Sequence, residues 1–360
     1  MNHILKTAVL ATAATGLTLA VQAQVEIRIT GSTAFRATTY AAIRNLYGAT
    51  LTGQNPAHDA SGKNQVTFAG TIPALFGAQT VTVRTSYSGS VEGIQSLVLG
   101  NNETFLLSSN AGDTNTVAGP ADIAFSDVFQ STTDFTSPTL SDTKVGIVSF
   151  AWVRSVTTPA SVSNMTHQLA QQFLATGDLP VGQFTGDLTQ TQDIYLVGRN
   201  KLSGTRITTQ ADCGYGGNAD AQLWQLDGAG GTVGTTFVQS TGFSSGGNAA
   251  AVLKVATATN PALSYLGISD ANGVNGGANL LTFNGVPFTV SNVWNGNYSF
   301  WAYEHAFLKP GVGANAKKFV QDAAGLKVAI DTILQTSTGN TALSKMKVAR
   351  NADGGPIFPQ

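Results

Sequence analysis

Residues 25–47 read VEIRITGSTAFRATTYAAIRNLY, and this stretch decides how the fold is interpreted. Apolar side chains alternate over residues 25–29, which indicates a strand. Residues 30–33 (Thr-Gly-Ser-Thr) predict a turn, and a helix is expected from Ala34 to Tyr47, with Gly48 as its stop. Three apolar residues recur at helical spacing in it: Tyr40, Ile43 and Tyr47. The stretch therefore predicts a strand, a short polar turn and a helix.

The same alternation of strands and helices continues along the chain, which predicts an α/β fold. Strands are expected at residues 80–87, 122–125, 145–153, 194–197, 263–268 and 298–307. Helices are expected around residues 94–98, at 167–174, after 203–205, at 248–256 and at 315–334. Residues 50–78 and 101–119 are expected to be loops, and the Gly/Ser-rich residues 214–247 give no clear pattern.

The composition excludes several classes of protein. Only 11% of the 360 residues are charged and the net charge is −1, whereas an average soluble protein has about 25% charged residues. A nucleic-acid-binding protein needs a surplus of Lys and Arg, so we expect no nucleic acid partner. A chain that is 42% hydrophobic can bury sizeable cores.

The first residues have the pattern of a secretory signal peptide. Lys6 precedes an apolar, small-residue stretch at residues 8–20, and Val21-Gln22-Ala23 resembles a cleavage site. We therefore expect residues 1–23 to be a leader, the mature chain to begin at Gln24, and the protein to be periplasmic or secreted. No later stretch reaches about 18 apolar residues, so no membrane insertion of the mature chain is expected.

Cysteine and histidine give little sign of chemistry. Cys213 is the single cysteine, so we expect it to be a small, buried, hydrophobic side chain. The mature chain has His58, His167 and His305 at spacings that match no common zinc motif. We expect no metal and no cofactor.

A junction of strand end, Gly/Ser/Thr turn and helix start recurs in the sequence. It occurs at residues 31–33, 89–90 and 203–205, and in weaker form at 246–248. A single Ser or Thr at such a place is a helix cap. Several together suggest an anion site, because helix N-termini present free N–H groups and α/β sheets bind ligands at the carboxyl ends of their strands.

Two charged residues fit an anion at these junctions. Arg199 follows a predicted strand and stands four residues before Ser203, and a guanidinium can bind two oxygens of a tetrahedral anion. Asp127 also follows a strand. A carboxylate there accepts a hydrogen bond from a protonated phosphate but repels a fully ionised sulfate, so it would select between them.

At these residues the chain resembles the periplasmic phosphate-binding proteins, the substrate-binding components of phosphate ABC transporters. The resembling motifs are Thr30-Gly31-Ser32-Thr33-Ala34-Phe35, Gly89-Ser90-Val91-Glu92-Gly93-Ile94, Asp122-Ile123-Ala124-Phe125-Ser126-Asp127, Arg199-Asn200-Lys201-Leu202-Ser203-Gly204-Thr205 and Asn260-Pro261-Ala262-Leu263-Ser264-Tyr265-Leu266-Gly267. They occur in the family's order over most of the mature chain, and the segment from Arg199 to Thr205 is the most specific of them.

The resemblance implies a two-domain type II periplasmic-binding-protein (flytrap) fold, each domain a mixed sheet flanked by helices. Residues 24–149 with 303–360 would form domain I, and residues 150–302 domain II. The implied function is capture of inorganic phosphate for an ABC transporter permease by a monomer without enzymatic activity. The implied phosphate-binding residues are Thr33, Ala34, Ser90, Asp127, Arg199, Ser203, Gly204 and Thr205.

Two residues depart from the family pattern. Lys201 stands where the family usually has an acid that supports the arginine, and Ala34 replaces an aromatic residue that follows here as Phe35. Both departures argue against strict selectivity for phosphate over other anions.

Two other readings remain open at this stage. Gly242-Phe243-Ser244-Ser245-Gly246 fits the G-x-S-x-G pattern, and Asp270 and His305 follow in the order of a serine hydrolase. The other reading is a flytrap protein that binds a different oxyanion or serves as a surface protein.

Overall fold

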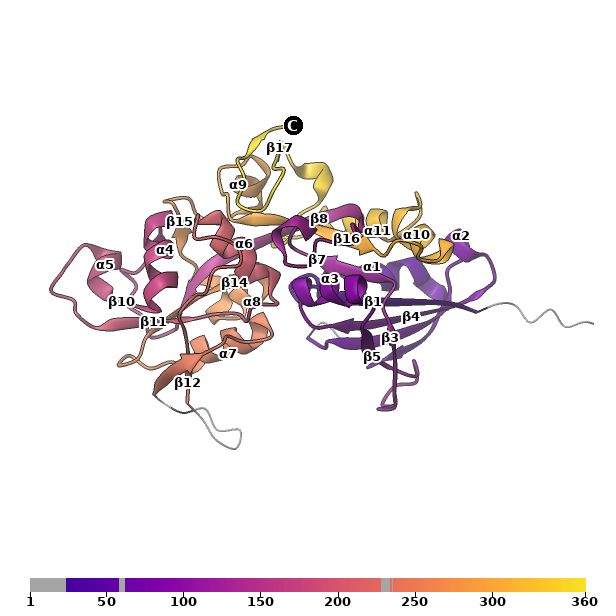
Figure 1. The fold of residues 1–360 in the computed structure, drawn as a ribbon, viewed down its shortest axis with the longest axis horizontal. Coiled ribbons are helices and arrows are strands. Elements are labelled where there is room, and N and C mark those ends of the chain that lie inside the picture. Colours follow the sequence, from indigo (N-terminus) through magenta and orange to yellow (C-terminus); the bar gives the residue numbers. More distant parts are fainter. Residues whose placement is uncertain (1–23, 58–61, 228–233, 235) are drawn as a thin grey trace, which may run out of the picture.

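The computed structural model describes residues 24–57, 62–227, 234 and 236–360, so the expected leader lies outside the described residues. Its main feature is a mixed sheet in the order β10-β11-β14-β8-β16-β7-β1-β4-β3-β2 (Figure 1). These strands are β1 (Val25–Gly31), β2 (Leu51–Asn55), β3 (Gln65–Thr71), β4 (Thr80–Tyr87), β7 (Ile123–Ser126), β8 (Ser141–Arg154), β10 (Asp178–Pro180), β11 (Asp193–Val197), β14 (Ala262–Gly267) and β16 (Trp301–Leu308). The expected α/β class is confirmed.

Strand β8 is long enough to belong to both halves of the molecule. Up to Ser149 it pairs antiparallel with β16, and from Phe150 onward it pairs antiparallel with β14. We call the part around β1, β4 and β7 the first lobe and the part around β11 and β14 the second lobe. Figure 1 shows them on either side of β8 and β16. The continuous apolar run expected at residues 145–153 is therefore the strand that connects the lobes.

In the first lobe, β1 lies parallel to both β4 and β7. Helices cover this sheet: α1 (Arg36–Tyr47), α2 (Pro73–Phe76), α3 (Ser90–Leu99), α10 (Ala314–Gln321) and α11 (Leu326–Leu334). Tyr40, Ile43 and Tyr47 are all buried, as their spacing predicted. The parallel strands bring the turn before α1, the start of α3 and the end of β7 to one edge of the sheet.

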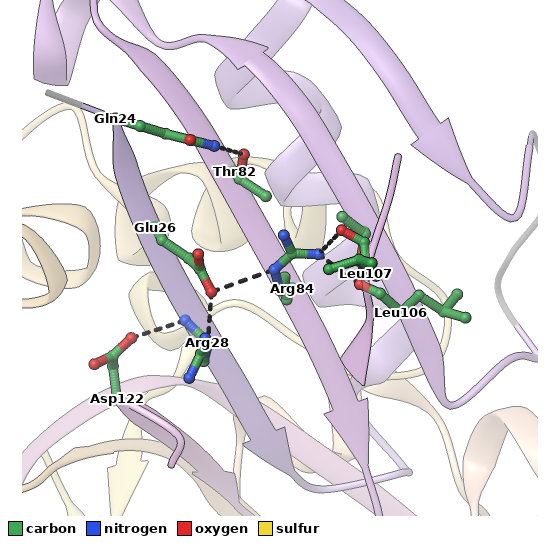
Figure 2. A network of polar contacts seen from close by, with 9 residues as sticks. Gln24, Glu26, Arg28, Thr82, Arg84, Leu106, Leu107 and Asp122 are labelled. Atoms are coloured by element: carbon green, nitrogen blue, oxygen red, sulfur yellow. Dashed lines mark hydrogen bonds and ion pairs between the residues drawn. The ribbon is translucent and has the colours of Figure 1, made fainter. Parts of the chain in front are cut away.

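A hairpin of β5 (Asn102–Leu106) and β6 (Thr116–Pro120) packs beside this sheet. Figure 2 shows the polar contacts near it. Glu26 pairs with Arg28 at 2.6 Å and with Arg84 at 3.2 Å, and Arg84 donates to the carbonyl groups of Leu106 and Leu107. One glutamate thus links the two parallel strands, and Arg84 fixes the hairpin to them.

The second lobe is built in the same way. It contains β9 (Asn164–Met165), α4 (His167–Thr176), α5 (Val181–Thr185), α6 (Gly204–Asp212), β12 (Leu223–Leu226), β13 (Phe237–Ser240), α7 (Gly246–Val255), α8 (Ile268–Asn272), β15 (Thr282–Phe283) and α9 (Val290–Trp294). Strands β11 and β14 are parallel, and α6 begins seven residues after β11 ends. The N-terminus of α6 therefore lies at the carboxyl edge of this lobe's sheet.

Three predictions of local structure were wrong. Residues 50–78 form β2, β3 and α2 instead of a loop, because Val66 and Phe68 are buried against the first-lobe sheet. Residues 101–119 contain the β5–β6 hairpin. The single helix expected over 315–334 is two helices, α10 and α11. The chain leaves the helical conformation at Asp322, and α11 begins after its N-cap Gly325.

The C-terminal segment crosses between the lobes and ends in a small hairpin of β17 (Val348–Ala349) and β18 (Phe358–Pro359). Arg350 is buried, pairs with Asp212 of α6 at 2.7 Å and lies 4.1 Å from the ring centre of Trp301. Asp353 accepts a hydrogen bond from the N–H of Phe129 at 2.9 Å in the first lobe. The segment therefore holds one residue of each lobe.

Candidate functional site

The predicted anion-binding residues lie where strands end and helices begin. Ser90 is the first residue of α3, Asp127 follows β7, and Ser203 is the N-cap of α6, its side chain accepting from the N–H of Arg206. All three are at most 3% exposed. Buried polar groups at a sheet's carboxyl edge are what a ligand site of this architecture requires.

The two lobes meet at Gly204. A Cβ placed on this residue would overlap Asp127 Oδ1 and lie 2.7 Å from Ser90 Cβ. Thr205 Oγ1 donates to Asp127 Oδ2 at 3.4 Å, and the N–H of Val91 donates to the carbonyl of Leu202 at 3.2 Å. Residues from β7 and α3 of the first lobe thus contact the start of α6 in the second lobe.

The first turn of α6 has hydrogen-bond donors to spare. No acceptor for the N–H groups of Gly204 and Thr205 appears among the described residues. The first N–H groups of any helix have no partner within the helix, and they carry the positive end of its dipole. Gly204 lies directly beside Asp127 and Ser90, so this turn can bind an anion oxygen near them.

Arg199 is held rigidly inside the second lobe. Its Nε donates to the carbonyl of Phe243 at 3.1 Å, and its Nη2 donates to that of Ser244 at 2.8 Å. The side chain is buried, which lowers its pKa, and the charges of Asp127 and Asp270 oppose this. Among described residues Nη1 has no acceptor, so one edge of the guanidinium is available for a ligand.

Asp127 is 1% exposed, and its Oδ1 has no hydrogen-bond partner among the residues described. Burial raises its pKa, while the Ser90 hydroxyl and the charge of Arg199 oppose that rise. An acceptor oxygen without a donor in a buried place is costly. A ligand that brings its own O–H would satisfy it.

Thr33 and Ala34 lie at the turn before α1. The N–H of the preceding Ser32 donates to the carbonyl of Phe125 at 2.8 Å, which places the turn beside the end of β7. The Ala34 methyl group lies 3.3 Å from where a Cβ on Gly267, at the end of β14, would be. This turn thus also reaches the second lobe. No contact joins Thr33 or Ala34 to Asp127 or Arg199 in the described chain.

Lys201 points away from these residues. Its side chain is 67% exposed and pairs with the exposed Asp220 at 2.5 Å. Lys201 therefore does not bring a second positive charge next to Arg199. Arg199 is oriented instead by main-chain carbonyl groups and by Tyr265, whose hydroxyl accepts from the Arg199 N–H at 3.2 Å.

Three charged residues near the site were not predicted as part of it: Arg36, Asp270 and Glu304. Arg36 donates to the Thr33 carbonyl at 2.8 Å, and its charge lowers the pKa of Asp270, which burial raises. Glu304 is completely buried in β16. The sequence already contained a sign of an unusual role for Glu304, because a carboxylate inside the aromatic run at residues 298–307 is rare in a buried strand.

The residues proposed as a hydrolase triad do not form one. His305 Nδ1 lies 2.8 Å from Asp142 Oδ1, and no hydrogen bond joins His305 to Asp270 or Ser244 in the described chain. Ser244 uses its carbonyl to hold Arg199. The G-x-S-x-G pattern lies between β13 and α7, and it supports the arginine through its main chain.

No group of three or more His, Cys, Asp or Glu side chains suited to a metal ion occurs among the described residues. No helix in the described part of the chain is both long and apolar enough to cross a membrane. Cys213 is buried, as expected, and burial raises the pKa of its thiol to about 12.

Comparison with solved structures shows the fold. A protein from Clostridium perfringens, described as a phosphate ABC transporter substrate-binding protein with bound phosphate, superposes with a TM-score of 0.52 at 16% identity, covering 86% of this chain and 93% of that one. An ABC-type phosphate transport receptor from Vibrio cholerae gives 0.46 at 16% identity, covering 84% and 98%. No family model matches this chain. The chain therefore shares its overall two-lobed fold with the Clostridium perfringens protein.

Proposed function

We propose that this protein captures inorganic phosphate between its two lobes and delivers it to an ABC transporter. The observation that carries the proposal is the meeting of Asp127, Ser90 and Gly204 across the lobes beside Arg199. The same position in the fold is where ligands bind in sheets of this kind. The Clostridium perfringens protein of the same fold has bound phosphate.

The chemistry of the residues fits phosphate better than sulfate. The first turn of α6, the Ser90 hydroxyl and Arg199 Nη1 are donors for the oxygens of the anion. Asp127 Oδ1 is an acceptor without a donor, and monohydrogen phosphate carries the proton that it needs. A sulfate ion has no proton at neutral pH and would place its charge against this carboxylate.

The proposal includes the parts that carry the function in the cell. The expected leader at residues 1–23 would export the chain, and a permease would receive the phosphate. Residues 24–149 with 303–360 would move as domain I and residues 150–302 as domain II, since β8 changes its partner strand between Ser149 and Phe150. Thr33 and Ala34 would close the site from the first lobe. The protein would act as a monomer and would catalyse no reaction.

Calorimetry with phosphate, sulfate and molybdate tests the proposal. Phosphate should bind with micromolar or better affinity, and absence of heat with all three anions would refute it. Arg199→Ala should weaken phosphate binding by about 2–4 kcal/mol, because it removes a charge-assisted contact to a desolvated anion. Lys201→Ala is the matched control and should bind normally, since its side chain is exposed and pairs with Asp220.

Asp127→Asn tests the selectivity argument separately. The asparagine keeps the size of the side chain and removes its charge, so sulfate affinity should rise relative to phosphate affinity. Tighter binding of sulfate than of phosphate by the unmodified protein would contradict the role given to Asp127.

A further inference from the structure

Glu304 lies on β16, at the centre of the sheet that joins the lobes. It pairs in register with Gly146 of β8, and the next residue, His305, pairs with Ser126 of β7. Residues paired directly across antiparallel strands point to the same face of the sheet. A Cβ on Gly146 would lie 2.8 Å from the ring of Phe35. Glu304 therefore points to the face where the turn before α1 lies.

The carboxyl group of Glu304 is unsatisfied. The residue is 0% exposed, and neither of its oxygens has a hydrogen-bond partner among the described residues. The same holds for Ser32 Oγ, Tyr87 Oη and Asp127 Oδ1. Such groups are rarely left without partners in a folded protein, because each one costs free energy.

These unpartnered groups are neighbours. Gly31, the residue before Ser32, pairs in register with Tyr87 of β4 and with Phe125 of β7, and β7 ends beside β16 just before Asp127. Asp127 and the Ser32 hydroxyl lie close enough to Glu304 to shift the pKa of its carboxyl group. Tyr87 is close enough that the charge of Glu304 raises the pKa of its hydroxyl. The cluster therefore extends the site of Asp127 toward β16, and it consists of groups that a polar ligand can satisfy.

The burial of Glu304, with neither carboxyl oxygen partnered among the described residues, favours the neutral form, because an unpaired buried charge is costly. Burial and the nearby Asp127 both raise its pKa well above its usual range, and the Ser32 hydroxyl opposes them only in part. Tyr87 of β4 also lies near it, and burial raises the pKa of that hydroxyl, while the charge of Arg36 lowers it. On its own strand, His305 is turned to Asp142. A neutral carboxyl group has an O–H to donate.

We propose that Glu304 contacts the bound anion as a neutral carboxylic acid, donating its O–H to an anion oxygen while Asp127 accepts the anion's own proton. This inference rests on the proposed function. It assigns to the site one acid that donates and one that accepts. The preferred ligand class is then a tetrahedral oxyanion with both a protonated and a bare oxygen.

Two variants separate this role from a structural one. Glu304→Gln is uncharged at every pH and keeps a donor, so its phosphate affinity should stay within about 3-fold of the unmodified protein. Glu304→Met keeps the volume and removes the donor, so its affinity should fall about 10-fold or more. The unmodified protein should lose affinity as rising pH ionises Glu304, and Glu304→Gln should lose less of it.

A second readout does not depend on the folding of Glu304→Met. In infrared difference spectra, the band of a protonated carboxyl group should shift when phosphate is added, and Glu304→Gln should lack that change. Tighter phosphate binding by Glu304→Gln, about 10-fold or more, would mean that the group is ionised and would overturn the inference. The inference would also be overturned if both Glu304 variants bound phosphate with unchanged affinity. If Arg199→Ala still weakened binding in that case, the proposed function would stand. Absence of phosphate binding in every form would refute the proposed function itself.

Discussion

Replacing Gly204 with alanine adds one methyl group at the point where the two lobes meet. Its Cβ would overlap Asp127 Oδ1 and lie 2.7 Å from Ser90 Cβ and 2.8 Å from Ser90 Oγ, whereas ordinary contacts begin at 3.4 Å. Ser90 begins α3 and Asp127 follows β7, so both are attached to the first-lobe sheet. Relief therefore requires α6 to withdraw from that sheet by roughly 0.7 Å or more.

The cost of this substitution falls on the closed, ligand-bound form. Overpacking by one methyl group typically costs about 1–3 kcal/mol. A withdrawal of this size would also lengthen the hydrogen bonds that the proposed anion accepts from the α6 N–H groups. We therefore expect a loss of about 2 kcal/mol in phosphate binding, which is roughly a 30-fold rise in Kd. Calorimetry measures the affinity, and thermal unfolding without phosphate shows that the variant folds.

Gly247→Ala is the control for this experiment. Gly247 also lies in the first turn of a second-lobe helix, but a Cβ there would be 3.7 Å from Asp270 Oδ1, which is an ordinary contact. Its Kd should stay within about 2-fold of the unmodified value, because nothing has to move. If Gly204→Ala bound phosphate as tightly as the unmodified protein, the anion would not lie between Asp127 and α6.

Three further predictions concern other groups. Arg199→Lys should weaken phosphate binding at least about 10-fold in calorimetry, because an ammonium group cannot hold two carbonyl groups and also bind the anion from a planar edge; normal binding would contradict the geometry given for Arg199. Burial raises the pKa of Asp353 to about 7 and that of Asp212 to about 6. Their protonated forms thus stabilise the fold below about pH 4, and this contribution is lost as the pH rises through 6 and 7. Denaturant unfolding should show stability falling over that range, less steeply in Asp353→Asn, and equal slopes in the two proteins would contradict this. Cys213 should react with iodoacetamide at pH 8 only after unfolding, because its thiol is buried with a pKa of about 12; rapid labelling of the folded protein, followed by mass spectrometry, would contradict this.

The strand and helix boundaries that the sequence predicted well are those with a strong local pattern. Residues 80–87 were expected as a strand and form β4 with the same limits, because apolar residues alternate there. Residues 50–78 and 101–119 were misjudged because their strands are short and rich in Thr, Asn and Gly. Such strands form through pairing with distant residues, as β3 does with β4. A local pattern contains no information about that partner.

The same distinction applies to the site. Asp127, Arg199 and the turn at residues 203–205 each follow a strand, so topology alone brings them to the sheet edges, and the sequence order predicted this placement. Glu304 lies in the middle of β16, a strand that no Gly/Ser/Thr turn marks, so a search for such turns could not find it. Arg36 was missed because it is the first residue of α1, where a charged side chain is ordinary and indicates no ligand.

Because the chain has few charged residues, the partners of its buried charges indicate which segments are held together. Only 11% of the residues are charged, and a buried charge is costly unless a particular partner satisfies it. Helix α6 connects two groups of such charges. Its first turn contacts Asp127, and its last residue, Asp212, pairs with Arg350 of the C-terminal segment.

That segment also holds the first lobe, because Asp353 accepts from the N–H of Phe129, two residues after Asp127. Helix α6 is thus tied to the β7 end of the first lobe twice: directly through Thr205 and Asp127, and indirectly through the C-terminal segment. In the proposed opening of the lobes, the direct contact between Thr205 and Asp127 would break, while the contacts of the C-terminal segment could persist. Under the proposed function, the C-terminal segment would then act as part of the hinge together with β8, because it contacts both lobes.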